Sequence, residues 1–211
     1  MFLYKTVGQY LIRPGLRLVY RAEVAGRERI PPEGPCILVA NHESTVDPFV
    51  LGLATPRVIR YMAKAELWRS GPLRFLMEGF GTFPVERGRG DRSAVGAARA
   101  LLEQGEIIGI FPQGTCLPLR RRPFLRTAAR LALETGTPVV PVGLVGTERI
   151  LRPHRPKSGL PKVRVLVAPP VAVERQTPTS RAARDLTAQL EQIVAEILRP
   201  YGEPAHAWID E

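Results

Sequence analysis

The chain has 211 residues, of which 45% are hydrophobic, and this is enough for one well-buried core. Its two cysteines, Cys36 and Cys116, give neither metal-ligand spacing nor the dense framework of a small disulfide-bonded domain, so a reducing cytosol is expected. The net charge of +10 attracts polyanions, whether nucleic acid, anionic lipid or phosphorylated substrates. Zinc-finger spacing and RNA-recognition signatures are both missing, so nucleic-acid binding is the weakest of these hypotheses and none is predicted.

The N-terminal segment has the pattern of amphipathic helices. Lys5, Arg13, Arg17 and Arg21 recur at multiples of four opposite apolar positions, and Pro14 is expected to divide the segment into two helices. No uncharged stretch reaches the roughly 20 residues that a membrane-spanning helix needs. Two interpretations stay open: the segment lies in the headgroup layer of an anionic membrane, or it packs on the domain as an ordinary helix.

We therefore predict an N-terminal membrane-contacting segment, 1–30, and one α/β domain, 31–211. Short apolar runs rich in β-branched residues alternate with segments of helical period, which is typical of a largely parallel sheet. The expected strands are 37–40, 58–62, 82–85, 107–111, 139–142 and 163–167. The clearest helices are 92–103, 124–134 and 181–198.

Reactive side chains gather in NHESTVDPF, at the end of the first predicted strand. His42 leaves the strand and Asp47 lies in the first turn of the next helix, so the reversal between them can bring carboxylate and imidazole together. A carboxylate on one ring nitrogen leaves the other to take a proton, as in a general base. For an isolated pair, a solvated histidine and a favourable first-turn charge would be the better explanation. Ser44 or Thr45 is expected to cap the helix.

Two further blocks strengthen the general-base interpretation. FPQGT, 111–115, also follows a strand, and its Pro and Gly predict a tight turn whose backbone amides can receive an anion. In GTFPVERG, Arg87 follows a strand and can bind a phosphate with both arms of its guanidinium. His154 and His206 have no ligand-spaced partners, so no metal site is predicted.

Together these blocks resemble the glycerolipid acyltransferase family, the 1-acylglycerol-3-phosphate acyltransferases and their relatives. NHESTVDP matches the first motif of that family, and KAELW with GTFPVER, then FPQGT, then VPVGL are similar to its second, third and fourth motifs in order. The resemblance covers nearly the whole chain. It implies a three-layer α/β/α fold with a mostly parallel mixed sheet, and a peripheral place on the cytoplasmic face of the cell membrane.

The resemblance also implies a reaction. His42, oriented by Asp47, would deprotonate the hydroxyl of a lysolipid such as 1-acylglycerol-3-phosphate as it attacks the thioester of acyl-CoA or acyl carrier protein, without an acyl-enzyme, a metal or a cofactor. Arg87 and the turn around Gly114 would hold the phosphate of the acceptor. The implied substrate-binding residues are Asn41, Lys64, Arg87, Gln113, Gly114 and Thr115.

The third block departs from the usual Phe-Pro-Glu-Gly-Thr-Arg-Ser. Gln113 keeps the shape of Glu without its charge, and Cys116 in place of Arg removes a phosphate ligand. An acceptor without phosphate, or a decayed module that only binds anionic membranes, therefore stays an alternative hypothesis. Basic residues downstream can restore the charge as phosphate or headgroup contacts, or they can form a solvated surface. These residues are Arg120, Arg121, Arg122 and Arg126.

Overall fold

The computed structural model describes residues 1–85, 92–114, 123–150 and 160–202. Its strands are β1 (Glu23–Ala25), β2 (Cys36–Ala40), β3 (Ile59–Lys64), β4 (Phe83–Val85), β5 (Ile107–Ile110), β6 (Val139–Val145) and β7 (Arg164–Val167). They form one seven-stranded sheet in the order β1-β7-β6-β2-β5-β3-β4. Neighbouring strands are parallel except β6 and β7. The mostly parallel mixed sheet predicted from the sequence is confirmed.

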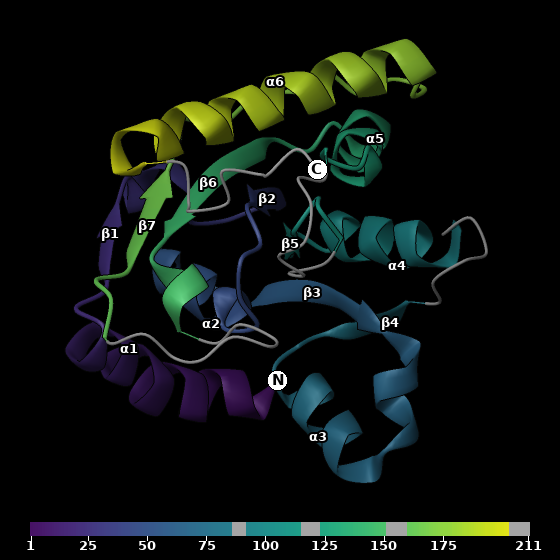
Figure 1. Ribbon diagram of the computed structural model, residues 1–211. Coiled ribbons are helices and arrows are strands. Elements are labelled where there is room, and N and C mark those ends of the chain that lie inside the picture. The colour runs from purple at the N-terminus through teal and green to yellow at the C-terminus, as the bar shows by residue number, and fades with distance from the viewer. Residues whose placement is uncertain (86–91, 115–122, 151–159, 203–211) are drawn as a thin grey trace, which may run out of the picture.

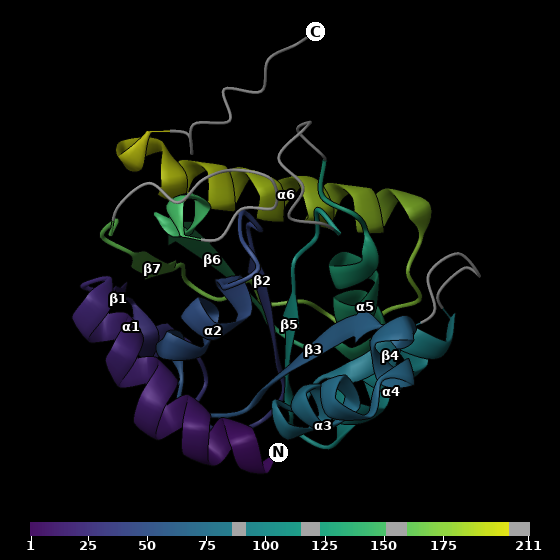
Figure 2. The same cartoon turned by 60° about the horizontal axis from the view of Figure 1, so that its bottom comes forward.

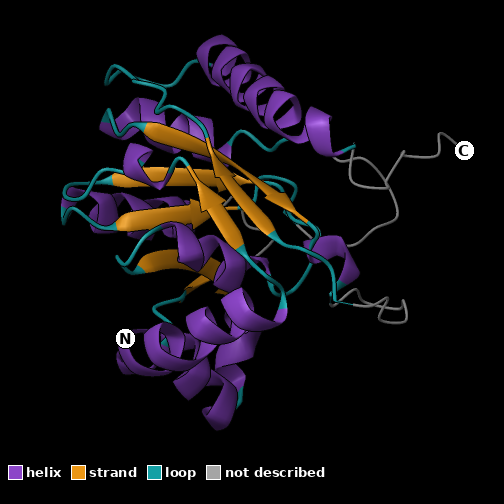
Figure 3. Ribbon diagram, turned by 90° about the vertical axis from the view of Figure 1, so that its left-hand side faces the viewer, coloured by secondary structure: helices purple, strands orange, loops and turns teal. Residues whose placement is uncertain are grey.

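Helices cover both faces of this sheet (Figures 1 and 3). One face carries α4 (Arg92–Glu103), α5 (Thr127–Thr135) and α6 (Ser180–Leu198). The other carries a π-helix, η1 (Tyr4–Ile12), followed by α1 (Arg13–Val19), α2 (Asp47–Leu51) and α3 (Gly71–Gly79). Short 3₁₀-helices are η2 (Arg27–Arg29), η3 (Gly52–Ala54), η4 (Ala65–Arg69), η5 (Thr147–Arg149) and η6 (Arg199–Tyr201).

The central strand β2 shows why this layering forms. All five residues of its CILVA sequence are buried, as expected for a strand that is covered on both faces. Leu38 and Ala40 belong to the core beneath α2, whereas Ile37 and Val39 pack in the core with Ala98 of α4 and other residues of α5 and α6. Alternate residues of one short apolar run therefore hold the two helical layers onto the sheet.

All six predicted strands and the three clearest helices are confirmed within a few residues at their ends. β1 was not predicted, because it has only three residues and is defined by its parallel pairing with β7. The expected division into two helices at Pro14 is confirmed, because η1 ends at Ile12 and α1 begins at Arg13. The chain passes from η1 into α1 without a loop, and Pro14 lies in the first turn of α1, where a missing N–H costs little.

One arginine ties together the loops at the amino ends of the central strands. The Arg57 guanidinium donates from Nη1 to the carbonyl of Pro31 at 2.9 Å. Its Nη2 donates to the carbonyls of Gly34 and Gly105 at 2.7 and 2.6 Å. Gly34 precedes β2 and Gly105 precedes β5, so a single side chain fixes the starts of two neighbouring strands.

Replacing Arg57 is therefore expected to destabilise the fold. Arg57→Ala removes three charge-assisted hydrogen bonds and should lower the free energy of unfolding by about 2 kcal/mol. Arg57→Lys should recover only part of this, because an ammonium lacks the planar fork. Urea denaturation measures the difference, with Arg184→Ala on the exposed side of α6 as the control, expected within about 0.5 kcal/mol of wild type. Equal urea midpoints for the two alanine variants would contradict the assignment.

Candidate active site

His42 and Asp47 meet where β2 ends and α2 begins. Asp47 Oδ2 lies 2.9 Å from His42 Nδ1. The Asp47 side chain is 0% exposed and that of His42 is 16% exposed. Because a carboxylate can only accept, the neutral imidazole carries its proton on Nδ1 and presents Nε2 as a proton acceptor. The contact predicted from the sequence is confirmed, and its geometry is that of an oriented general base.

The same carboxylate oxygen also organises the turn between the two residues. Asp47 Oδ2 accepts hydrogen bonds from the backbone N–H groups of Glu43 at 2.6 Å and Ser44 at 2.7 Å. Contrary to the prediction, neither Ser44 nor Thr45 is the N-cap residue of α2, although Ser44 Oγ accepts a hydrogen bond from the N–H of Val46 at 3.4 Å. The N-cap residue is Val46, which makes no capping hydrogen bond through its side chain. The turn is instead held from within the helix, by the carboxylate of its first residue.

An aromatic stack supports the other side of the imidazole. The His42 ring stacks on Phe111 with centroids 4.3 Å apart, and Phe111 stacks on Tyr61 at 5.9 Å. The Tyr61 hydroxyl donates to the carbonyl of Pro48 at 2.9 Å, and burial raises the pKa of Tyr61 well above its ordinary value. A Cβ at Gly109 would overlap the Tyr61 ring, so the glycine in β5 leaves the space that the stack requires. A lone Gly in the apolar strand IIGI was the only sequence signal for this support.

A cavity of about 850 Å³ adjoins His42. It lies between the ends of β3, β4 and β5 on one side and α2, α3 and η1 on the other, and most of its lining is apolar. Apolar side chains in this lining include Ile12, Met62, Leu76, Met77, Phe80 and Val85. A volume of this order is typical of small-molecule sites.

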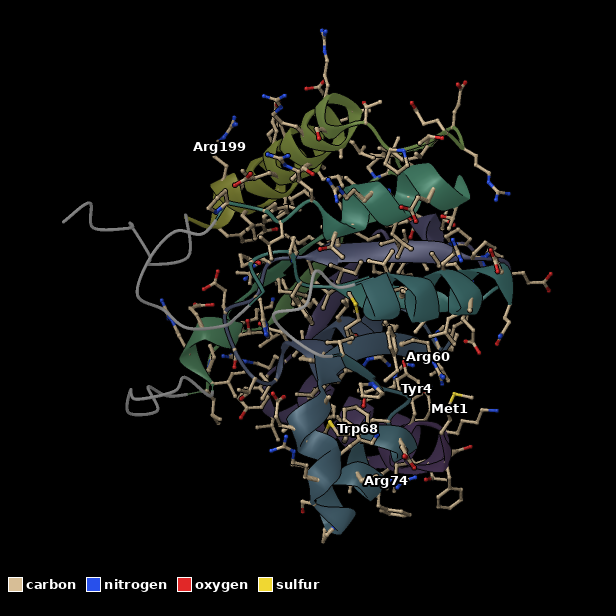
Figure 4. All side chains as sticks on the ribbon, turned by 90° about the vertical axis from the view of Figure 1, so that its right-hand side faces the viewer. Met1, Tyr4, Arg60, Trp68, Arg74 and Arg199 are labelled. Carbon is tan, nitrogen blue, oxygen red and sulfur yellow. The ribbon has the colours of Figure 1, made fainter. Side chains whose placement is uncertain are left out.

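The N-terminal π-helix forms one wall of this cavity. The Tyr4 hydroxyl donates to the carbonyl of Arg57 at 2.8 Å, and burial raises the pKa of Tyr4 to about 12. In Figure 4, Met1 and Tyr4 lie beside Arg60 of β3, at the end of the molecule away from Arg199. The structure therefore confirms the interpretation in which this segment packs on the domain, and contact of its exposed side with a membrane stays a prediction.

Within FPQGT, residues 111–114 form a turn, but Gly114 does not offer its N–H as the expected anion-binding amide. The N–H of Gly114 donates to the carbonyl of Phe111 at 3.0 Å, and Gly114 has φ +73°, where glycine is favoured. Gln113 lines the cavity, and its Oε1 is buried with no hydrogen-bond partner among the described residues. A buried acceptor without a partner costs about 1–3 kcal/mol, which a ligand donor would recover.

Asn41, predicted as a substrate contact, has a different role in the structure. Its Nδ2 donates to the carbonyl of Leu144 at 2.9 Å, and its Oδ1 accepts from the N–H of Leu144 at 2.7 Å. The side chain is buried and is not part of the cavity lining. Asn41 therefore holds the carboxyl ends of β2 and β6 together, which positions His42.

The other predicted site residues are placed only in part. Lys64 is the last residue of β3. Arg126 is exposed just before α5, between Leu125 and Thr127, which line the cavity. The remaining predicted contacts lie outside the described residues: Arg87, Thr115, Arg120, Arg121 and Arg122.

Comparison with known proteins identifies the family in which this fold and this His–Asp pair belong. The model of the family described as Acyltransferase matches residues 21–145, so the chain belongs to this family. The chain is 32% identical to the 1-acyl-sn-glycerol-3-phosphate acyltransferase of Bacillus subtilis, with 59% of the chain and 62% of that relative covered. It is 33% identical to the human 1-acyl-sn-glycerol-3-phosphate acyltransferase alpha, with 75% of the chain and 57% of that relative covered.

The fold is shared with a solved structure, the 1-acyl-sn-glycerophosphate acyltransferase of Thermotoga maritima. The TM-score is 0.72 at 24% identity, over 91% of this chain and 79% of that chain. The matched segments span 39 to 62% of the length of the curated relatives from Brassica napus, Bacillus subtilis and human. In the parts of the chain that the structure describes, no helix is both long and apolar enough to cross a membrane.

The three hydrogen bonds on Asp47 predict an order of stability among its variants. Asp47→Ala leaves two backbone N–H groups and the imidazole without their acceptor, and should lower the free energy of unfolding by about 3 kcal/mol. Asp47→Asn can offer an amide oxygen in the same place and should cost about 1 kcal/mol. Urea denaturation of both variants measures this order. An alanine variant as stable as the asparagine variant would show that the carboxylate does not hold the turn.

Proposed function

We propose that the protein is an O-acyltransferase that transfers a fatty acyl group from acyl-CoA or acyl carrier protein to the hydroxyl of 1-acylglycerol-3-phosphate, giving phosphatidate for phospholipid biosynthesis. The observation that carries the proposal is the His42–Asp47 pair at the edge of a largely apolar cavity. Membership of the acyltransferase family and similarity to 1-acyl-sn-glycerol-3-phosphate acyltransferases support it. We also propose that the acyl thioester serves as co-substrate and that no cofactor takes part.

In the proposed reaction, Nε2 of His42 takes the proton of the acceptor hydroxyl as the hydroxyl oxygen attacks the thioester carbonyl. The C–S bond then breaks, the ester forms, and the proton on His42 passes to the departing thiolate. Asp47 stabilises the imidazolium that forms in between, because its buried carboxylate touches Nδ1. The apolar part of the cavity would hold the fatty chain away from water.

Recognition of the phosphate is proposed for the cationic residues near the third block. Arg126 supports this, since it is exposed beside residues that line the cavity. Arg87 and Arg120 to Arg122 complete the proposed set on sequence grounds. A second candidate acceptor is a lysolipid without phosphate. Gln113 favours it, because its neutral amide with a buried Oε1 suits a hydroxyl or amide donor on the acceptor.

We further propose that residues 1–30 hold the enzyme on the cytoplasmic face of an anionic membrane. Large apolar side chains on this segment are exposed, among them Phe2 at 72% and Leu18 at 83%. Phe75 of α3 is exposed as well, and α3 lies beside the N-terminal helix, since Gly79 of α3 is next to Leu3 (Figure 2). An apolar surface on helices flanked by cations is typical of interfacial binding.

The first experiment measures thiol release from acyl-CoA and from acyl carrier protein with a panel of lysolipids, with and without phosphate. We expect acceptor-dependent release that His42→Ala abolishes and that Asp47→Asn lowers on the order of 100-fold or more, because the imidazolium loses its counter-charge. Circular dichroism checks that both variants are folded. The best acceptor decides between the two candidates. No release with any acceptor, from folded protein that binds anionic vesicles, would instead favour a membrane-binding module.

The acyl-chain length that the enzyme prefers should depend on Gly8, where η1 faces the cavity. Among the described residues, the atoms nearest to a Cβ built at Gly8 are the carbonyl oxygen of Leu3 at 3.6 Å and side-chain atoms of Phe80 and Tyr4 at 4.0 Å. Because Gly8 lines the cavity, a longer side chain there should take up part of its volume. The absence of a side chain at Gly8 therefore enlarges the space between η1 and α3.

Gly8→Leu is expected to shift the preferred acyl donor to a shorter chain. Competition between donors of different length measures the ratio of their kcat/KM values, which should change by about tenfold for a loss of two methylenes. Gly15→Leu is the matched control, because Gly15 lies on α1 with nothing within 4 Å of a Cβ. An unchanged length preference in Gly8→Leu would place the fatty chain elsewhere.

A further inference from the structure

A second hollow, with a volume of about 640 Å³, lies between the N-terminal helices and the segments that carry Arg27 and Pro56. Three arginines line it: Arg13 and Arg17 of α1, and Arg27 of η2. Among the residues that the structure describes, no acidic side chain lines this hollow. We call this hollow the arginine groove; its remaining lining includes Gln9, Leu18 and Pro56.

The charges of the arginine groove are not neutralised within the chain as far as the structure describes it. Among the described residues, none of the three guanidinium groups forms an ion pair with a carboxylate. Burial lowers the pKa of Arg13, and the like charges of Arg17 and Arg27 lower it further. Three like charges that face one hollow repel one another, and an anion between them would remove that repulsion.

Arg13 is fixed in position for such an anion. Its Nη1 donates to Gln9 Oε1 at 2.8 Å and to the carbonyl of Thr55 at 3.0 Å, and its Nη2 donates to the carbonyl of Leu53 at 3.2 Å. A guanidinium has five N–H donors, so these three hydrogen bonds leave two for a ligand. Holding the side chain in place in advance lowers the entropy cost of binding.

The surroundings of the groove favour a lipid headgroup over a free ion. Leu18 lines the groove and is 83% exposed, so an apolar side chain projects beside the three cations. α1 lies on the outside of the molecule (Figure 2). Leucine next to arginine on an outer helix matches the boundary between acyl chains and phosphates in a membrane.

We propose that the arginine groove binds the phosphate of an anionic lipid headgroup, at a site separate from the catalytic cavity. A phosphate monoester such as that of phosphatidate fits best, because several oxygens can accept hydrogen bonds from different guanidinium groups at once. The proposal adds a defined headgroup site to the membrane contact, and it does not depend on the acyl-transfer reaction.

The test compares two double variants of the full chain that each remove two positive charges from the N-terminal segment. Arg17→Gln with Arg27→Gln alters the groove, whereas Lys5→Gln with Arg21→Gln removes exposed cations outside it. Binding to phosphatidylcholine vesicles with and without phosphatidate is measured by co-sedimentation. We expect the groove variant to bind phosphatidate vesicles about tenfold more weakly than the control variant. Both variants lose the same charge, so this difference would come from the groove.

The proposal would be overturned if the two double variants weakened vesicle binding equally, or if vesicle binding did not depend on phosphatidate. It would also be overturned if inorganic phosphate displaced the vesicles at constant ionic strength, because the ligand would then be a free ion. Weaker binding of acyl carrier protein by the groove variant, with vesicle binding intact, would assign the groove to the carrier. Thiol release without vesicles should be the same in the groove variant as in wild type. A failure of the proposed acyl-transfer reaction can therefore be distinguished from a failure of the headgroup site.

Discussion

A single carboxylate oxygen controls the geometry of the site. Asp47 Oδ2 accepts from one imidazole and two backbone N–H groups, and the side chain is fully buried. Moving a carboxylate out of water costs several kcal/mol unless donors replace the lost water. The donors here come from the residues that the carboxylate must position, His42, Glu43 and Ser44. Supplying donors to the buried Oδ2 and orienting the base are therefore the same interaction, whereas Oδ1 is buried without a hydrogen-bond partner among the described residues.

The rest of the sheet confines His42 from other directions. Phe111, which follows β5, stacks on the imidazole, and Asn41 binds the end of β2 to Leu144 of β6. β5 and β6 are the two neighbours of β2 in the sheet. The carboxyl ends of adjacent parallel strands meet at one edge, which is where open α/β sheets bind their ligands. The base is thus held by Phe111, which follows β5, and by Asp47 of α2, while the bonds from Asn41 to β6 fix the strand end that carries it.

Local features of the site were predictable from the sequence, and long-range ones were not. The strands follow from apolar β-branched runs, and the His42–Asp47 contact follows from a spacing that spans one chain reversal. Asn41 was misassigned because its partner, Leu144, is 103 positions away in the chain. Arg13 was expected among the exposed cations on the basis of α-helical spacing. The π-helix before it bonds Arg13 N–H to the carbonyl of Gly8, five residues back, and the Arg13 side chain turns toward the domain.

Arg13 lies between the catalytic cavity and the arginine groove. This residue lines both the cavity and the arginine groove, so one helix separates them. The helix is held there by polar contacts to one short segment: Tyr4 to the carbonyl of Arg57, Gln9 to that of Pro56, and Arg13 to that of Thr55. These bonds tie a helix with exposed apolar side chains to the body that carries His42. In the proposed function, the acyl chain in the cavity and the headgroup in the arginine groove therefore contact the same N-terminal helices, and Arg13 lies between the two ligands.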